Sequence, residues 1–386
     1  MDISRRALCT AALGGAGLAI GQAAVAMPKA SIATKAAPLA LAGKWSGEGF
    51  PVTEHVLKTD RHTTFYLACG ANDAPLVIFV HGWPELSHSW RHQLPVFAAL
   101  GFRAIAPDMR GYGRSTVHPE KSDYSLQNIT ADMIELLDAL GRKQAIWVGH
   151  DWGSPVVWAI ASHHPERCHA VANLCVPYLP NDLSVISFVD RSIYPIDKYA
   201  VGQWDYFFFY QEHFDKARSD FEGNVAATVK LLFRKGNPAG AGKPAFTASI
   251  RANGGWFGGA QAAPDLPRDA DVLTESDVDV YTESLTRNGF TGPDSWYLNN
   301  EANAAFGRKS LDGGRISLPV LFLHAEYDYT CQTVTGTLAH PMRASCPDLT
   351  EMVVKTGHWM AQENPVVVNK ALAAWISAKL PAIWRG

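Results

Sequence analysis

Four short apolar runs constrain the fold of this 386-residue chain more than any other feature. Each is four or five residues long and almost free of polar side chains. Runs of this kind are typical of parallel strands that helices cover on both faces. They occupy residues 76–80, 103–106, 145–149 and 170–174.

Helical patterns separate the apolar runs. Five apolar residues recur at helical spacing between the second and third runs, and Gly141 follows at the usual stop position. Two further strands are predicted at 319–324 and 350–354, followed by a final helix that begins at Pro365. Strands that alternate with helices indicate an α/β fold with a mostly parallel central sheet. The five apolar residues of the first helix are Ile129, Met133, Leu136, Leu137 and Leu140.

The N-terminal side of the sheet is expected to begin with a hairpin. Residues 53–57 and 63–69 are predicted strands, and the polar residues 59–62 between them suit a turn.

The alternation stops near residue 178 and resumes after residue 310. The intervening residues are rich in aromatics and contain a Gly/Pro/Ala-rich interval at 236–267. We interpret 178–310 as a mainly helical cap inserted after the fifth or sixth core strand. The core domain then consists of residues 50–177 and 311–386.

The first 26 residues have the pattern of a secretory signal. A basic start with adjacent Arg5 and Arg6 precedes a short apolar stretch and an Ala-x-Ala end at Ala26. The arginine pair resembles a twin-arginine signal, so we expect export, to a bacterial periplasm or the medium. Residues 27–49 form an Ala/Pro/Gly-rich leader.

Composition excludes several classes of protein. Hydrophobic residues make up 47% of the chain, so disorder is not its main state. A formal charge of −3 gives no electrostatic reason to expect nucleic acid or an anionic membrane as a partner. We therefore expect neither nucleic acid binding nor stable membrane association after processing. Oligomeric state stays open.

Six cysteines are too few for a disulfide scaffold, and none forms Cys-x-x-Cys. Cys9 leaves with the signal, so an odd number remains. Cys331 and Cys346 could pair in an oxidising compartment, but the sequence does not establish any pairing. The five cysteines of the mature chain are Cys69, Cys168, Cys175, Cys331 and Cys346.

The hexapeptide Gly149-His-Asp-Trp-Gly-Ser154 directly follows a predicted strand and precedes a helical run. This is the layout of a nucleophile elbow, Gly-x-Ser-x-Gly, with Asp151 in the place of the serine. Small residues are needed there because the nucleophile occupies a strained turn. The alternative interpretation is a glycine-bounded turn in which Asp151 caps a helix.

The order of later residues supports the elbow. In an α/β-hydrolase the nucleophile is followed by an acid and then a histidine, here Asp328 (with Glu326 as a competing acid) and His358. The backbone N–H groups of Trp83 and Trp152 occupy the positions of an oxyanion hole.

Taken together, these motifs resemble those of the α/β-hydrolase-fold epoxide hydrolases. The resemblance implies that two cap tyrosines hold the epoxide oxygen: Tyr206, for which Tyr210 is a possible substitute, and Tyr297. It implies no metal and no organic cofactor. The motifs are His81–Glu85, Ser89–Gln93, Pro107–Ser115, Gly149–Gly153, Ala325–Asp328 and Gly357–His358.

An aspartate at the elbow points to attack on saturated carbon. Its reference pKa is about 3.9, so the side chain is already ionised at neutral pH and can form an alkyl ester. His358 would then activate water to hydrolyse the ester and release a vicinal diol. The expected substrates are a small apolar epoxide and water.

Three other functions could be expected of a chain with these motifs. A haloalkane dehalogenase uses the same triad, and an exported binding protein could retain the fold without turnover. A carboxylesterase is disfavoured because an acyl group on Asp151 would form an anhydride. His88 and His92, four apart on an expected helix, have no evident third metal ligand, and His163 and His164 are expected to face solvent.

Overall fold

The computed structural model describes residues 31–35 and 50–384. The predicted signal peptide and most of the leader lie outside the described residues.

In the described part of the chain, nine strands form one sheet in the order β1-β2-β3-β5-β4-β6-β7-β8-β9. The pairs β1/β2, β2/β3 and β3/β5 are antiparallel, and the remaining pairs are parallel. The strands are β1 (Ser31–Lys35), β2 (Thr53–Lys58), β3 (Thr63–Cys69), β4 (Leu76–Val80), β5 (Arg103–Pro107), β6 (Ala145–His150), β7 (Cys168–Leu174), β8 (Val320–Ala325) and β9 (Leu349–Val354).

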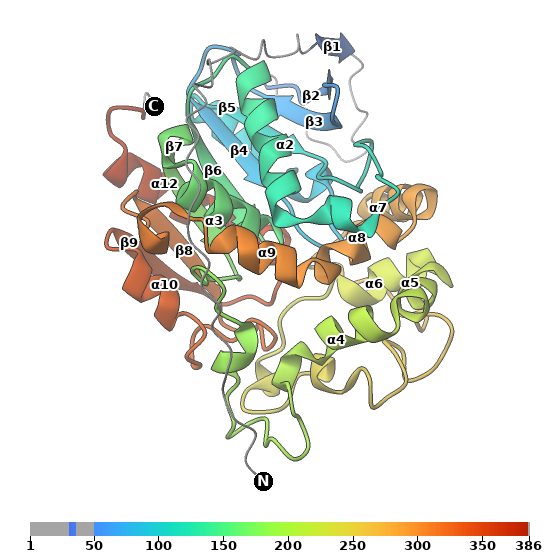
Figure 1. The fold of residues 1–386 in the computed structure, drawn as a ribbon. Coiled ribbons are helices and arrows are strands. Elements are labelled where there is room, and N and C mark those ends of the chain that lie inside the picture. The colour runs from blue at the N-terminus through green and yellow to red at the C-terminus, as the bar shows by residue number, and fades with distance from the viewer. Residues whose placement is uncertain (1–30, 36–49, 385–386) are drawn as a thin grey trace, which may run out of the picture.

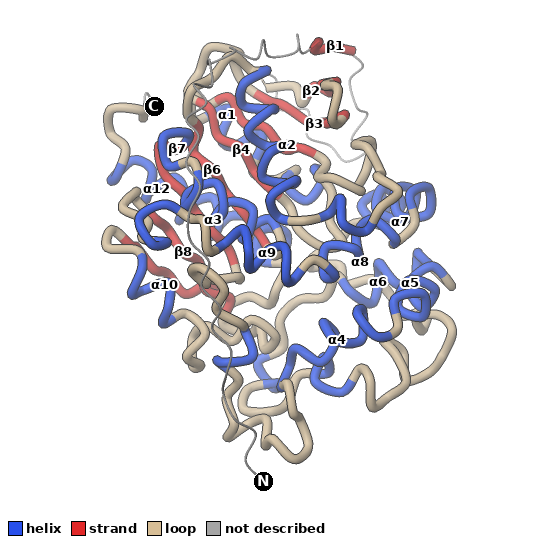
Figure 2. The backbone as a smooth tube through the Cα atoms, in the orientation of Figure 1, coloured by secondary structure: helices blue, strands red, loops and turns tan. Residues whose placement is uncertain are grey.

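Helices cover both faces of this sheet (Figures 1 and 2). β4 shows why its residues must all be apolar: Ile78 packs into the core beneath α2 and α3, while Phe79 points to the core beneath α1 and α12. The core helices are α1 (Leu94–Ala99), α2 (Leu126–Ala139), α3 (Gly153–His163), α10 (His340–Ser345), α11 (Met360–Glu363) and α12 (Pro365–Lys379).

The chain leaves the sheet after β7 and returns at β8, and the segment between them is mainly helical, as predicted. Counted from the hairpin strand β2, β7 is the sixth core strand. In Figure 1 helices α4, α5 and α6 lie together beyond one end of the sheet. The helices of this segment are α4 (Asp205–Glu212), α5 (Phe214–Glu222), α6 (Val225–Leu232), α7 (Glu275–Asn288), α8 (Thr291–Ser295) and α9 (Asn300–Gly307).

Two expectations need correction, and the structure decides one possibility that the sequence left open. The leader contains a strand, β1, which extends the sheet by pairing with β2. The helix expected to carry both His88 and His92 is a short 3-10 helix, Ser87–Trp90, and His88 contacts Asp277 of α7 at 2.7 Å. The possible bond between Cys331 and Cys346 is absent, since both are free buried thiols.

Within the described ranges, every helix is too short or too polar to cross a membrane.

The turn after β5 links the sheet to the cap. Arg110 forms a two-pronged contact with the carboxylate of Asp132 on α2, with both hydrogen bonds at 2.7 Å and both residues buried. The carbonyl of Arg110 accepts a hydrogen bond from the Trp296 indole. Because Trp296 precedes Tyr297, this buried pair positions the cap residues that face the end of the sheet.

Replacing Asp132 with alanine should lower the free energy of unfolding by about 3–5 kcal/mol, because the Arg110 charge would remain buried without its partner. Denaturant unfolding measures the change. The control is Asp138→Ala on the same helix, where a half-exposed pair with Arg167 is lost and less than about 1 kcal/mol is expected. Equal decreases in the free energy of unfolding for the two variants would contradict the stabilising role of the buried Arg110–Asp132 pair.

Candidate active site

Asp151 stands at the turn between β6 and α3 in a strained backbone conformation. Its φ is 49°, in the left-handed region that non-glycine residues rarely occupy. A Cβ on Gly153 would lie 2.1 Å from the Val80 carbonyl oxygen, and one on Gly149 would lie 2.5 Å from that of Gly153. The turn therefore requires the small residues that the sequence places around Asp151.

One backbone amide donates to the Asp151 carboxylate, and the amide nitrogen of Trp152 lies nearby. The N–H of Trp83 donates to Oδ1 at 2.6 Å. A Cβ on Gly82 would lie 2.4 Å from this same oxygen and 2.5 Å from the Trp152 nitrogen. Gly82 is thus the residue that allows Trp83, Trp152 and the carboxylate to approach one another.

His358 lies between two carboxylates. Its Nε2 is 3.3 Å from Oδ2 of Asp151, and its Nδ1 is 2.6 Å from Oδ2 of Asp328. The other oxygen of Asp328 accepts the backbone N–H groups of Thr330 and Cys331. Asp328, rather than Glu326, is therefore the acid in contact with His358.

Charge determines the protonation of this group. Burial alone would lower the pKa of His358, but the Asp328 charge and the contacts with Asp151 and Asp328 outweigh it and raise the pKa well above the usual value. Burial opposes ionisation of Asp328 too, yet the His358 charge and the hydrogen bonds lower its pKa. The resting site thus favours an imidazolium.

A second buried pair, without an assigned role in the sequence analysis, lies behind His358. Nδ1 of His150 is 2.7 Å from Glu85 Oε2, and its Nε2 donates to the backbone carbonyl of His358 at 2.7 Å. The charge of Glu85 overcomes burial and raises the pKa of His150, while His150 holds the pKa of Glu85 at about 2. Both residues stand inside motifs quoted above, but only the fold reveals that they meet.

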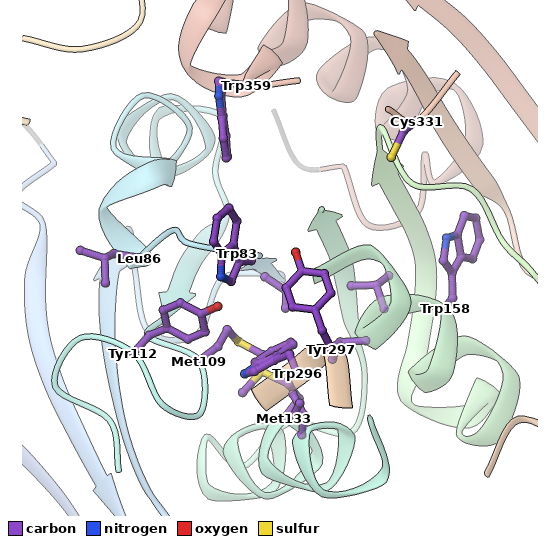
Figure 3. Close-up of a cluster of buried hydrophobic side chains, with 14 of the residues drawn as sticks. Trp83, Leu86, Met109, Tyr112, Met133, Trp158, Trp296, Tyr297, Cys331 and Trp359 are labelled. Atoms are coloured by element: carbon purple, nitrogen blue, oxygen red, sulfur yellow. The ribbon is translucent and has the colours of Figure 1, made fainter. Parts of the chain in front are cut away.

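An apolar cavity begins at Asp151. Tyr206, from α4, and Tyr297, after α8, line it together with Trp152. Tyr210 does not line the cavity: its ring stacks on Tyr297 at 4.5 Å and its hydroxyl is buried without a partner. Of the two candidates on α4, the geometry selects Tyr206. Figure 3 shows Tyr297 within the aromatic cluster that includes Trp83 and Trp296.

The two phenols stay protonated at neutral pH, so each can donate a hydrogen bond to a bound molecule. Burial raises the pKa of both Tyr206 and Tyr297 well above 10, and the Asp151 charge adds to the effect. Neither hydroxyl forms a hydrogen bond with any residue in the described ranges. Neither is among the fully buried polar atoms, and both tyrosines line the cavity. Both remain available to a bound molecule.

The expectation that His163 faces solvent is wrong. Its ring stacks on Phe306 of α9 at 3.9 Å and lines the cavity. The sequence could not reveal this contact because the cap segment supplies it. His164 is partly exposed.

Two sets of side chains could offer ligands to a metal: His150, Cys175 and His358, and Asp328, Cys331 and His358. In each set the histidines already bind protein acceptors. Burial raises the pKa of Cys331 well above 9, which opposes the thiolate that a metal requires. The absence of a metal stays a prediction.

Fold and site define an α/β hydrolase whose nucleophile position carries an aspartate. Residues 75–365 match the family model described as the alpha/beta hydrolase fold, and the chain belongs to this family. It is 33% identical to epoxide hydrolase A of Mycobacterium tuberculosis, covering 84% of this chain and 97% of that protein. It is 35% identical to bifunctional epoxide hydrolase 2 of Sus scrofa over 78% of this chain, but spans only about half of that relative (51%).

The chain is also similar to solved structures of epoxide hydrolases. Epoxide hydrolase A from Mycobacterium thermoresistibile superposes with a TM-score of 0.69 at 30% identity, covering 84% of this chain and 98% of that one. An epoxide hydrolase from an endophytic Streptomyces superposes with a TM-score of 0.70 at 30% identity, covering 85% and 96%.

Removing either carboxylate beside His358 should lower its pKa, because each negative charge stabilises the imidazolium. We expect Asp328→Asn to lower it more than Asp151→Asn, as the Asp328 charge is the strongest stabilising influence. A pH titration of the ¹⁵N-labelled histidine ring signals checks this, with His358→Gln identifying the signal. A pKa that stays constant in both variants would contradict the geometry.

Proposed function

We propose that this chain is an epoxide hydrolase that opens an epoxide to a vicinal diol through an ester on Asp151. One observation carries the proposal: the Asp151 carboxylate, held by an amide and next to His358, borders an apolar cavity with two phenols that lack other partners. The similarity to proteins named epoxide hydrolases supports it.

In the first step Oδ2 of Asp151 attacks an epoxide carbon, while Oδ1 remains bound to the Trp83 amide. The new bond is the ester C–O bond, and the bond that breaks is the C–O bond of the strained ring. Tyr206 and Tyr297 hold the ring oxygen, and one phenol transfers its proton to the developing alkoxide.

In the second step His358 activates water. Once the ester has formed, Asp151 no longer carries a negative charge beside the ring, so the pKa of His358 falls. The imidazolium gives its proton to the phenolate that the first step left, which restores the tyrosine and leaves a neutral imidazole. It then accepts a proton from water, and the hydroxide attacks Cγ of Asp151. The Trp83 and Trp152 amides stabilise the oxyanion on Oδ1. Its collapse breaks the ester C–O bond at Cγ, and the proton of the added hydroxyl passes to the leaving oxygen, which restores the Asp151 carboxylate and releases the diol.

Haloalkane dehalogenation remains the second candidate, because the Trp152 indole lines the cavity and could hold a halide. The paired phenols favour the epoxide, since a halide leaves without needing a proton. Measuring halide release against diol formation on a mixed substrate panel separates the two. An exported binding protein would bind epoxides without turnover.

A single turnover in heavy-oxygen water tests the covalent route. We expect the label in the Asp151 carboxylate before it reaches the diol, as measured by peptide mass spectrometry. Asp151→Ala should abolish turnover, and His358→Gln should accumulate the ester because hydrolysis is the impaired half. Label that enters the diol directly would exclude the ester.

Matched substitutions can distinguish the role of Tyr206 and Tyr297 from that of the neighbouring Tyr210. Tyr206→Phe and Tyr297→Phe should each slow ester formation by about 10²-fold or more through loss of a proton donor. Tyr210→Phe is the control, because it deletes a buried hydroxyl that has no partner. Rapid-quench measurement of ester formation distinguishes them, and an equal effect of all three changes would reject the assignment.

We also propose that the protein is exported through a twin-arginine signal. The support is the basic start with Arg5 and Arg6, the short apolar stretch and the Ala-x-Ala end. Replacing both arginines with lysine should retain the chain in the cytoplasm, and sequencing of the exported form should find a start after Ala26. Export of the doubly substituted chain would refute the signal.

A further inference from the structure

We propose that the preferred substrate is a terminal epoxide with one long, uncharged, apolar substituent. This inference rests on the proposed function and specifies its substrate class. It comes from the shape of the space around Asp151, which is open on one side and filled on the other.

The open side follows α3. Besides Asp151 and Trp152, the cavity is lined by Ala159 and His163 on the same helix, and it reaches the exposed residue Asn181. From Trp152 to His163 the helix rises by about 16 Å, at 1.5 Å per residue. An extended alkyl chain advances roughly 1.2 Å per bond, so a chain of about thirteen bonds fits this length.

The walls of this channel favour an uncharged chain. No lysine or arginine lines it, and Asp151 is its one carboxylate, among the residues that the structure describes. Burial lowers the pKa of His163 to about 4, so the histidine near the outer end is neutral at neutral pH. A substrate carboxylate would find no cation along the channel wall, whereas methylene groups would find aromatic and aliphatic side chains.

The side of Tyr297 that faces away from the channel is filled by the Trp83 indole, whose backbone N–H binds the Asp151 carboxylate (Figure 3). This ring contacts Phe221 at 5.2 Å and stacks on Trp256 at 5.9 Å between centroids, and none of the three lines the cavity. Figure 3 shows Trp83 on one side of Tyr297, with Trp158 and Cys331 on the other.

A buried hydrogen bond fixes the blocking ring. The Trp83 Nε1–H donates to Oδ1 of Asp294 at 2.9 Å, and Asp294 is fully buried. Turning the indole aside would leave its N–H and this carboxyl unpaired, which is costly in an apolar environment. Only one arm of an epoxide can therefore extend from the reacting carbons, and the other position must carry hydrogen.

Two isomers of equal composition test the shape: 1,2-epoxydecane and cis-5,6-epoxydecane. We expect kcat/KM for the terminal isomer to exceed that for the internal isomer by at least 100-fold. From 1,2-epoxybutane to 1,2-epoxydecane it should rise two- to fourfold per methylene, the gain expected for each buried methylene. Equal values for the isomers, or no dependence on length, would overturn the inference.

Substitutions in the channel and beside Trp83 test which residues cause the preference for a long terminal epoxide. Ala159→Phe narrows the channel and should reduce the ratio of kcat/KM for epoxydecane to that for epoxybutane at least tenfold. Ala374→Phe, on the exposed face of α12, is the matched control and should keep the ratio. Trp256→Ala makes room beside Trp83 and should raise turnover of the internal isomer at least tenfold, with Trp256→Leu replacing it if the alanine variant does not fold.

The results of these experiments separate a failure of the proposed substrate shape from a failure of the proposed epoxide hydrolase function. Diol formation and ester labelling without terminal preference would overturn only the substrate shape. No diol from any member of the series would overturn the proposed function and this inference with it.

Discussion

The left-handed backbone of Asp151 is the constraint on which the site depends. It turns the chain sharply from β6 into α3, and the Asp151 carboxylate at this turn borders the cavity. The conformation is strained for aspartate, and it persists because Gly149, Gly153 and Gly82 leave room that no larger residue would. The amide of Trp83 and the ring of His358 then reach the same carboxylate from different segments.

Electrostatic interactions connect Asp151 to the buried charged residues around it. His358 is held between Asp151 and Asp328, and its backbone carbonyl is held by His150, which is paired with Glu85. The two histidines lie next to each other, and each is paired with a carboxylate of opposite charge: His150 with Glu85, and His358 with Asp328 and Asp151. Neutralising one member, as an ester on Asp151 does, changes the proton affinity of the next. Protonation at His358 can therefore follow the chemical state of Asp151 without large movement.

Sequence patterns predicted the sheet and the triad well, because strand periodicity and motif order are local properties. The hairpin, the parallel strands and the meeting of Asp151, Asp328 and His358 all appear in the structure. Contacts made by the cap were harder to predict from the sequence. The choice between Tyr206 and Tyr210 depends on which ring faces the cavity, and the packing of His163 on Phe306 joins segments far apart in the chain. Periodicity contains no information on such pairings.

The added strand β1 has a consequence for the edge of the sheet. Pairing with Ser31–Lys35 satisfies the outer N–H and C=O groups of β2, which would otherwise face outward as a template for another chain. A protein shortened to begin at residue 50 keeps every residue of the triad and the cavity yet loses this cover. Its solubility at high concentration would then fall through edge-to-edge association, although its chemistry is intact.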